Sequence, residues 1–268
     1  MRRIQEQWSR LREKGDKALI AFIVAGDPDL PKSGEIVLAL ADAGVDIVEL
    51  GVPFSEPIAD GPVIQRSGDR AIRKGAFLPA ILDLVKQIRS KSEVPLVLFS
   101  YLNPILRYGL ERFSNDAVAS GADSVLVTDL SVEEAAPFVA QMRRKELDTV
   151  FLAAPTSTDE RLKRVAEYST GFVYAVSRAG TTGAKDTLSS AIGPLLGRLR
   201  SMTRLPIAAG FGISRPEHLA QLAPLADGVV VGSALVRVIE EHPDNPAPHA
   251  AEFARWLRTG FKAPVPRH

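Results

Sequence analysis

The sequence contains no cysteine. This absence excludes disulfide bridges, thiolate catalysis and cysteine-ligated zinc. It also fits a reducing cytoplasm, where we expect the protein to reside. No apolar run approaches the roughly 18 residues of a transmembrane helix, and residues 1–17 lack the apolar segment of a secretory signal. We therefore expect no membrane contact.

The sequence also has no large excess of charge of one sign. Lys and Arg number 33 and Asp and Glu 32, and no stretch concentrates five or six like charges. This balance argues against a nucleic-acid-binding surface. Histidine is scarce, and every one lies in the last quarter of the chain, in expected helical or tail positions: His218, His242, His249 and His268. We expect these to be surface residues, and we expect no histidine-ligated metal.

Short β-rich apolar runs alternate with amphipathic segments along the 268 residues. Several runs, such as "SVLV" and "GVVV", are apolar on both faces, which is typical of a parallel sheet covered by helices. The expected strands are Ala18–Val24, Asp46–Leu50, Leu96–Phe99, Ser124–Val127, Thr149–Leu152, Phe172–Val176, Pro206–Ala208 and Gly228–Val231.

Eight such units without a break in composition predict an α/β fold, a single (β/α)8 TIM barrel over residues 1–268. A doubly wound sheet is the alternative, because the pattern alone does not show closure. Residues 1–16 are expected to form an extra N-terminal helix with Ile4, Trp8 and Leu11 on one face, and residues 241–268 a C-terminal helix and tail.

Two local signals accompany this pattern. The segments "AGVDIVEL", "SGADSVLV" and "LADGVVVG" resemble one another, as the junctions of repeated units would. Three capping boxes predict helix starts at Ser131/Glu134, Ser157/Glu160 and Ser214/Glu217.

The expected active site follows from the spacing of the strands. The segments 51–95 and 177–205 are longer than the other connections. Elaborated loops after barrel strands build active sites at the carboxyl ends of those strands. Residues 177–188, rich in glycine and threonine, are expected to form a mobile lid.

Two carboxylates lie in this region. Strand alternation places Val48 and Leu50 toward the helices and Glu49 toward the barrel mouth, where desolvation favours a neutral acid. Asp60 follows in the long loop. The alternatives are a buried Glu49 paired with a basic residue and an Asp60 that caps the loop before Gly61-Pro62.

Glycine-rich turns follow the last three expected strands: "SRAGTTGAK", "AGFGIS" and "VGSAL". They place Gly212, Gly232 and Ser233 at or near helix starts, where backbone N–H groups bind anions. None of the expected strands carries a lysine, which argues against Schiff-base chemistry. The residues thus indicate a metal-free barrel enzyme that acts on a small phosphate ester by carboxylate acid–base chemistry.

The segment "VELGVPFSEPIADGPVIQ" resembles the signature of the tryptophan synthase α-subunit family. The resemblance continues through "YLNPIL", "GADSVLVTDLSVEEA", "SRAGTTGA", "GFGIS" and "VVGSALV", from about residue 17 to residue 240. It implies retro-aldol cleavage of indole-3-glycerol phosphate to indole and glyceraldehyde 3-phosphate. It also implies a catalytic pair, Glu49 and Asp60, with phosphate ligands Gly183, Gly212, Gly232 and Ser233 and pocket residues Phe22, Tyr174, Thr182 and Phe211.

The family's partner is a pyridoxal-phosphate-dependent β subunit in an α2β2 assembly, so the resemblance implies that this chain itself carries no cofactor. Glu56 and Ser131 depart from the family's usual aspartate and proline, and we expect them to affect coupling to that partner.

Three rival functions stay open at this point. A stand-alone indole-3-glycerol phosphate lyase would share the catalytic pair. A phosphosugar isomerase could use Asp27 as a base, although "AAPTST" offers no matching acid. A catalytically silent subunit is disfavoured by the intact acids.

Overall fold

A closed barrel of eight parallel strands forms the centre of the molecule. The computed structural model describes residues 3–176, 191–210 and 212–262. Each strand pairs with the next, and the eighth pairs with the first, so the barrel prediction is confirmed and the doubly wound alternative is wrong. The strands are β1 (Ala18–Val24), β2 (Ile47–Gly51), β3 (Leu96–Ser100), β4 (Ser124–Val127), β5 (Asp148–Ala153), β6 (Val173–Val176), β7 (Ile207–Gly210) and β8 (Gly228–Val231).

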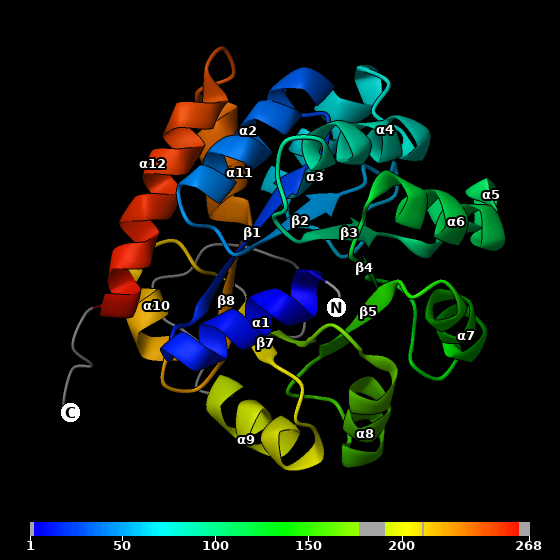
Figure 1. The fold of residues 1–268 in the computed structure, drawn as a ribbon, viewed down its shortest axis with the longest axis vertical. Helices are drawn as coiled ribbons and strands as arrows, with labels where there is room; N and C mark the ends of the chain where they lie inside the picture. The colour runs from blue at the N-terminus through cyan, green and yellow to red at the C-terminus, as the bar shows by residue number, and fades with distance from the viewer. Residues whose placement is uncertain (1–2, 177–190, 211, 263–268) are drawn as a thin grey trace.

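Helices surround the barrel on the outside (Figure 1). In the described part of the chain they are α1 (Arg3–Lys14), α2 (Leu30–Asp42), α3 (Pro62–Arg73), α4 (Leu78–Arg89), α5 (Leu102–Tyr108), α6 (Leu110–Ser120), α7 (Ala136–Arg144), α8 (Asp159–Tyr168), α9 (Ile192–Met202), α10 (Pro216–Leu222), α11 (Ser233–Glu241) and α12 (Pro246–Arg258). A short 3-10 helix, Thr259–Lys262, follows. No helix of these described segments is long and apolar enough to cross a membrane.

The strand residues separate into an outer and an inner layer. Val48 and Leu50 pack with the surrounding helices, whereas Ile47 belongs to the cluster inside the barrel. Helix α1 lies across one end of the barrel in Figure 1 and buries Ile4 and Trp8 in that inner cluster. The predicted apolar face of the N-terminal helix therefore closes the end of the barrel opposite the carboxyl ends of the strands.

The three capping boxes are wrong in detail. Helix α7 begins at Ala136, beyond Ser131/Glu134. Helix α8 is capped by Thr158, whose side chain accepts a hydrogen bond from the backbone N of Arg161. In the third box the backbone N of Ser214 donates to Nδ1 of His218 at 3.2 Å. A sequence match selects a candidate cap, but the path of the preceding loop selects the residue that is used.

The expectation of surface histidines is also wrong for one of the four. His218 is 4% exposed on α10. The rings of His242 and His249 are half-buried and stack, with centroids 3.7 Å apart, and His268 lies outside the described residues.

The repeated junction segments share one aspartate contact. Asp46, Asp123 and Asp227 directly precede β2, β4 and β8. Each carboxylate accepts a backbone N–H near the start of the preceding strand, at 2.9 Å from Leu19, 2.8 Å from Leu96 and 2.8 Å from Ile207. Each also binds an arginine: Arg258, Arg89 and Arg200, respectively.

These contacts join neighbouring strands at their amino ends. Asp46 and Asp123 are buried and Asp227 is half-buried. Each carboxylate satisfies an N–H group that would otherwise lack a partner, and the arginine compensates its charge. The same aspartate contact therefore occurs three times at the amino end of the barrel, away from the carboxyl ends of the strands.

We predict that Asp123→Ala lowers the free energy of unfolding by about 3 kcal/mol, because it leaves the buried guanidinium of Arg89 without its carboxylate. Asp159→Ala is the control, since Asp159 is 67% exposed in its ion pair with Arg198. We expect that change to cost less than about 1 kcal/mol. Urea unfolding of both variants measures the difference, and equal shifts would contradict this account.

Candidate active site

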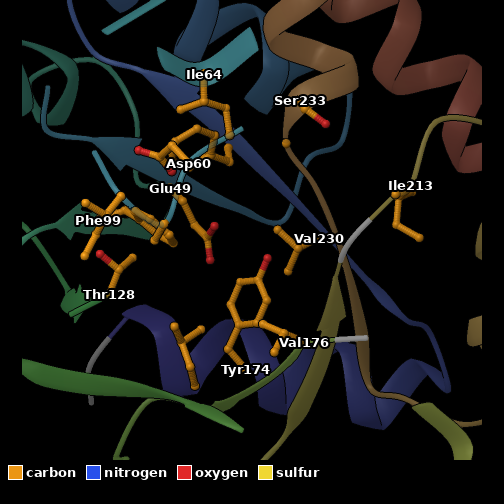
Figure 2. Close-up of a pocket in the computed structure, with 16 residues that line it drawn as sticks. Glu49, Asp60, Ile64, Phe99, Thr128, Tyr174, Val176, Ile213, Val230 and Ser233 are labelled. Carbon is orange, nitrogen blue, oxygen red and sulfur yellow. The ribbon is translucent and has the colours of Figure 1, made fainter. Parts of the chain in front are cut away.

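One pocket of about 320 Å³ opens at the carboxyl ends of the strands. It brings together seven of the ten residues proposed from the sequence, and Figure 2 shows several of them around the cavity. These seven are Phe22, Glu49, Asp60, Tyr174, Gly212, Gly232 and Ser233. Thr182, Gly183 and Phe211 lie outside the described residues, as does the proposed lid 177–188.

Glu49 is fully buried at the centre of β2. Its strand neighbours are Phe22 on β1 and Val97 on β3, so its side chain is surrounded by the barrel interior. Neither carboxyl oxygen has a hydrogen-bond partner among the described residues. The alternative of a salt-bridged Glu49 therefore finds no basic partner in this part of the chain.

Burial without a partner sets the protonation of Glu49. Desolvation raises the pKa of this carboxyl group from 4.5 to about 8. A charged carboxylate in such surroundings would cost several kcal/mol, so the neutral acid predominates at pH 7. Glu49 is thus a buried, neutral acid that carries a proton at pH 7.

Asp60 lies in the loop between β2 and α3. Its Oδ2 accepts a hydrogen bond from the Tyr101 hydroxyl at 3.1 Å, and this hydroxyl accepts one from the backbone N of Ala59 at 3.0 Å. Burial raises the pKa of Asp60 to about 6, while the hydrogen bond from Tyr101 lowers it. The hydrogen bond described for its carboxylate goes to this tyrosine, so the loop-cap interpretation of Asp60 finds no support in the described residues.

The two acids therefore differ in their charge at neutral pH. With a pKa of about 8, Glu49 is mostly protonated at pH 7, whereas Asp60, with a pKa of about 6, is mostly ionised. Pairs of carboxyl groups whose environments separate their pKa values in this way can act as acid and as charge stabiliser in one reaction.

Tyr174 completes the inner wall of the pocket. In Figure 2 its hydroxyl and the Glu49 carboxyl group point toward each other across the cavity. Burial, with a smaller contribution from the Glu49 charge, raises the pKa of Tyr174 well above its ordinary value. A Cβ on Gly210 would lie 2.4 Å from the Tyr174 hydroxyl oxygen. A larger residue at this position would therefore clash with the Tyr174 side chain.

The other end of the pocket is built from two loops. Gly212 has φ +76°, a conformation that favours glycine. Gly232 is the N-cap of α11, and Ser233 is the first residue of that helix. The start of α11 lines the pocket, and the N–H groups and dipole of a helix start can bind an anion.

Sequence reasoning missed two polar side chains of the site. Tyr101 directly follows β3 and, from outside the pocket lining, binds Asp60 across 41 positions of the chain. Thr128, just after β4, lines the pocket and donates to the Ser100 carbonyl at 3.3 Å. The available signal was their place immediately after a strand, where barrel active sites gather polar side chains.

Asp27 is not available as the base of a phosphosugar isomerase. Both of its carboxylate oxygens accept hydrogen bonds from Arg70, at 2.9 and 2.7 Å, and Ser67 donates to Oδ2 at 2.5 Å. This rival therefore loses the residue on which it depended.

The chain matches the family model described as "Tryptophan synthase alpha chain" over residues 8–263. It is similar to the tryptophan synthase alpha chain of Solibacter usitatus (strain Ellin6076), with 52% identity over 98% of this chain and 99% of that relative. The tryptophan synthase alpha chain of Geotalea uraniireducens (strain Rf4) is 46% identical over the same shares.

Solved structures agree with these matches. A structure of Mycobacterium tuberculosis tryptophan synthase superposes with a TM-score of 0.90 at 37% identity, over 98% of this chain and 99% of that one. A chain of the tryptophan synthase complex from Pyrococcus furiosus superposes with a TM-score of 0.85 at 41% identity, over 90% and 98%. With the matched family model and this full-length similarity, the chain belongs to the tryptophan synthase alpha chain family.

Proposed function

We propose that this chain, as the α subunit of tryptophan synthase, cleaves indole-3-glycerol phosphate to indole and glyceraldehyde 3-phosphate. The observation that carries the proposal is the buried, protonated Glu49 in the same apolar pocket as the ionised Asp60. The helix start at Ser233 in that pocket supplies the phosphate end.

The reaction breaks the bond between indole C3 and the first carbon of the glycerol chain. Glu49 protonates C3, which places positive charge on the ring nitrogen. The carboxylate of Asp60, with one oxygen held by Tyr101, accepts the ring N–H and stabilises this charge.

Glu49, now ionised, takes the proton from the hydroxyl on the carbon next to C3. A carbonyl forms there, the carbon–carbon bond breaks, and its electrons return to the ring as neutral indole. Glu49 is thereby protonated again, so one residue serves as acid and base without net proton loss.

The rest of the pocket binds the two ends of the substrate. Phe22 and Tyr174 line the cavity beside Glu49, and with Thr182 and Phe211 they are proposed to hold the indole and the glycerol chain. The backbone of Gly183, Gly212 and Gly232 and the hydroxyl of Ser233 are proposed to bind the phosphate.

The partner is a tryptophan synthase β subunit, with an α2β2 assembly proposed. Ile58, in the loop carrying Asp60, is 77% exposed, and Leu106 on α5 is 56% exposed. Ile58 lines the pocket, and an exposed apolar side chain at its rim supports a protein contact there. Glu56 is proposed to act in that contact. Pyridoxal phosphate is assigned to the β subunit, with no cofactor in this chain, and the location is proposed to be the cytoplasm.

Indole release from indole-3-glycerol phosphate tests the proposal directly. We expect slow release by the purified chain alone and strong stimulation on titration with a β subunit. Fast release without stimulation would instead favour a stand-alone lyase. Absence of release under both conditions would contradict the proposed reaction.

Glu49→Gln is expected to lower kcat at least about 100-fold, because the amide cannot donate and recover the proton. The same substitution also changes how the free energy of unfolding depends on pH. Since the folded pKa of about 8 exceeds the unfolded value of 4.5, the stability linked to Glu49 is present below pH 4.5 and is lost as pH rises through 8. The variant should therefore lose a slope of about 1.4 kcal/mol per pH unit in this window.

Urea unfolding between pH 5 and pH 8 measures this slope. Glu56→Gln, which changes an exposed acid in the following loop, serves as the control and should keep both the slope and the release of indole by the isolated chain. A Glu49→Gln variant with near wild-type indole release would remove Glu49 from the mechanism.

Tyr101→Phe is expected to shift the acid limb of the pH profile of kcat/KM. In the wild type, activity rises as Asp60 ionises near pH 6 and falls as Glu49 loses its proton near pH 8. Loss of the tyrosine hydrogen bond raises the pKa of Asp60, so the acid limb should move to higher pH, with about a tenfold lower maximum.

The basic limb should stay in place. Substrate phosphate also titrates near pH 6, but it does so identically for both proteins, so the shift isolates Asp60. Tyr108→Phe is the matched control, because the Tyr108 hydroxyl binds Asp116 at 2.5 Å and does not line the pocket. An unshifted acid limb in Tyr101→Phe would separate Tyr101 from the ionisation of Asp60.

A further inference from the structure

A network of charged side chains joins three elements beside the pocket. Arg70 on α3 binds both carboxylate oxygens of Asp27, in the loop after β1, and its Nη1 donates to Glu240 on α11 at 2.8 Å. Arg66, one turn earlier on α3, also donates to Glu240, at 3.0 and 2.9 Å.

The centre of this network is buried. Asp27 is 3% exposed and receives a third hydrogen bond, from Ser67. Hydrogen bonding to Asp27 raises the pKa of Arg70, and the bonds from Arg66 and Arg70 lower the pKa of Glu240 to about 2. Arg70 and Glu240 are therefore charged at neutral pH. The planar, bidentate geometry of Arg70 against Asp27 restricts orientation as well as distance.

The two helices in this network supply different parts of the pocket. Helix α3 begins two residues after Asp60 and contributes Ile64 to the lining. Helix α11 begins at Ser233, on the phosphate side. In Figure 2, Asp60 and Ile64 lie together on one side of the cavity, and Ser233 lies apart from them at the start of its helix.

Apolar side chains of the two helices also meet close to the pocket. Ile64 of α3 and Val236 of α11 share a small cluster with Phe22. The loop after β1 packs against the later turns of α3 and the residues after it, since a Cβ on Gly26 would be 3.3 Å from Cβ of Ala71 and 2.2 Å from Cβ of Ala76. Arg70 and Glu240 also lie in the later turns of their helices, so the network joins α3 and α11 away from the helix starts, and a tilt of either helix at this joint would move its start at the pocket.

We propose that the Asp27–Arg70–Glu240 network fixes the spacing between the Asp60 side and the Ser233 side of the pocket, so that Arg70 is a positioning residue. The inference rests on the proposed function, in which one substrate spans both sides. A ligand that spans both sides gains affinity only if the sides are held at the right separation, whereas a ligand that occupies one side is indifferent to that separation.

Binding of one spanning ligand and of its two halves tests this spacing. The spanning ligand is an indole joined through a three-carbon chain to a phosphate, and the halves are indole and glycerol 3-phosphate, each measured by calorimetry on the full chain. Arg70→Lys keeps the charge but loses the bidentate geometry. We expect it to lower the affinity for the spanning ligand about tenfold. Each half should bind within about twofold of wild type.

Two further variants complete the experiment. Glu240→Gln should also weaken binding of the spanning ligand. If Arg70→Lys does not fold, the result for Glu240→Gln alone tests the proposal. Arg164→Lys is the control, because Arg164 pairs with Glu160 on α8 and binds no member of the network. We expect it to leave all three affinities unchanged.

The possible outcomes distinguish a failure of the positioning role from a failure of the proposed function. Unchanged binding of the spanning ligand in both Arg70→Lys and Glu240→Gln overturns the inference, as does an equal loss for the halves. A wild-type chain that binds neither the spanning ligand nor indole would contradict the proposed function itself, and with it this inference.

Discussion

Desolvation of Glu49 is the constraint on which the pocket depends. The ring of eight strands encloses this carboxyl group, and no described residue donates to it. A neutral acid is the state that such surroundings favour. Closure of the barrel thus keeps the Glu49 carboxyl group protonated near neutral pH. The other pocket residues surround this carboxyl group. Asp60 differs because it lies on a loop, where Tyr101 can reach it.

Stability and chemistry occupy opposite ends of the barrel. At the amino ends of the strands, Asp46, Asp123 and Asp227 accept hydrogen bonds from backbone N–H groups of neighbouring strands and pair with arginines. At the carboxyl ends, Glu49 is left without such a partner in the described chain. An acid that is satisfied contributes to the fold, whereas an acid that is not satisfied retains a proton that it can transfer.

Local periodicity carried much of what could be predicted. Each strand lies within two residues of its expected bounds, because strands buried on both faces are continuous apolar runs. The inward direction of Glu49 followed from alternation with Val48 and Leu50, and the structure confirms it. Cap positions failed because the loop path decides which side chain reaches the helix start, as Thr158 on α8 illustrates. Burial of His218 was missed because a short helix gave too little periodicity to reveal its face.

The sequence by itself determined the strand positions, the side of the strand on which Glu49 lies, and the family, because these depend on residues close together in the chain or on a long matching motif. Tertiary structure alone decided that the sheet closes, that Tyr101 holds Asp60, and that Arg70 joins Asp27 to Glu240. The physical reason is distance along the chain. Arg70 and Glu240 are 170 positions apart and meet only because closure of the barrel sets their helices side by side.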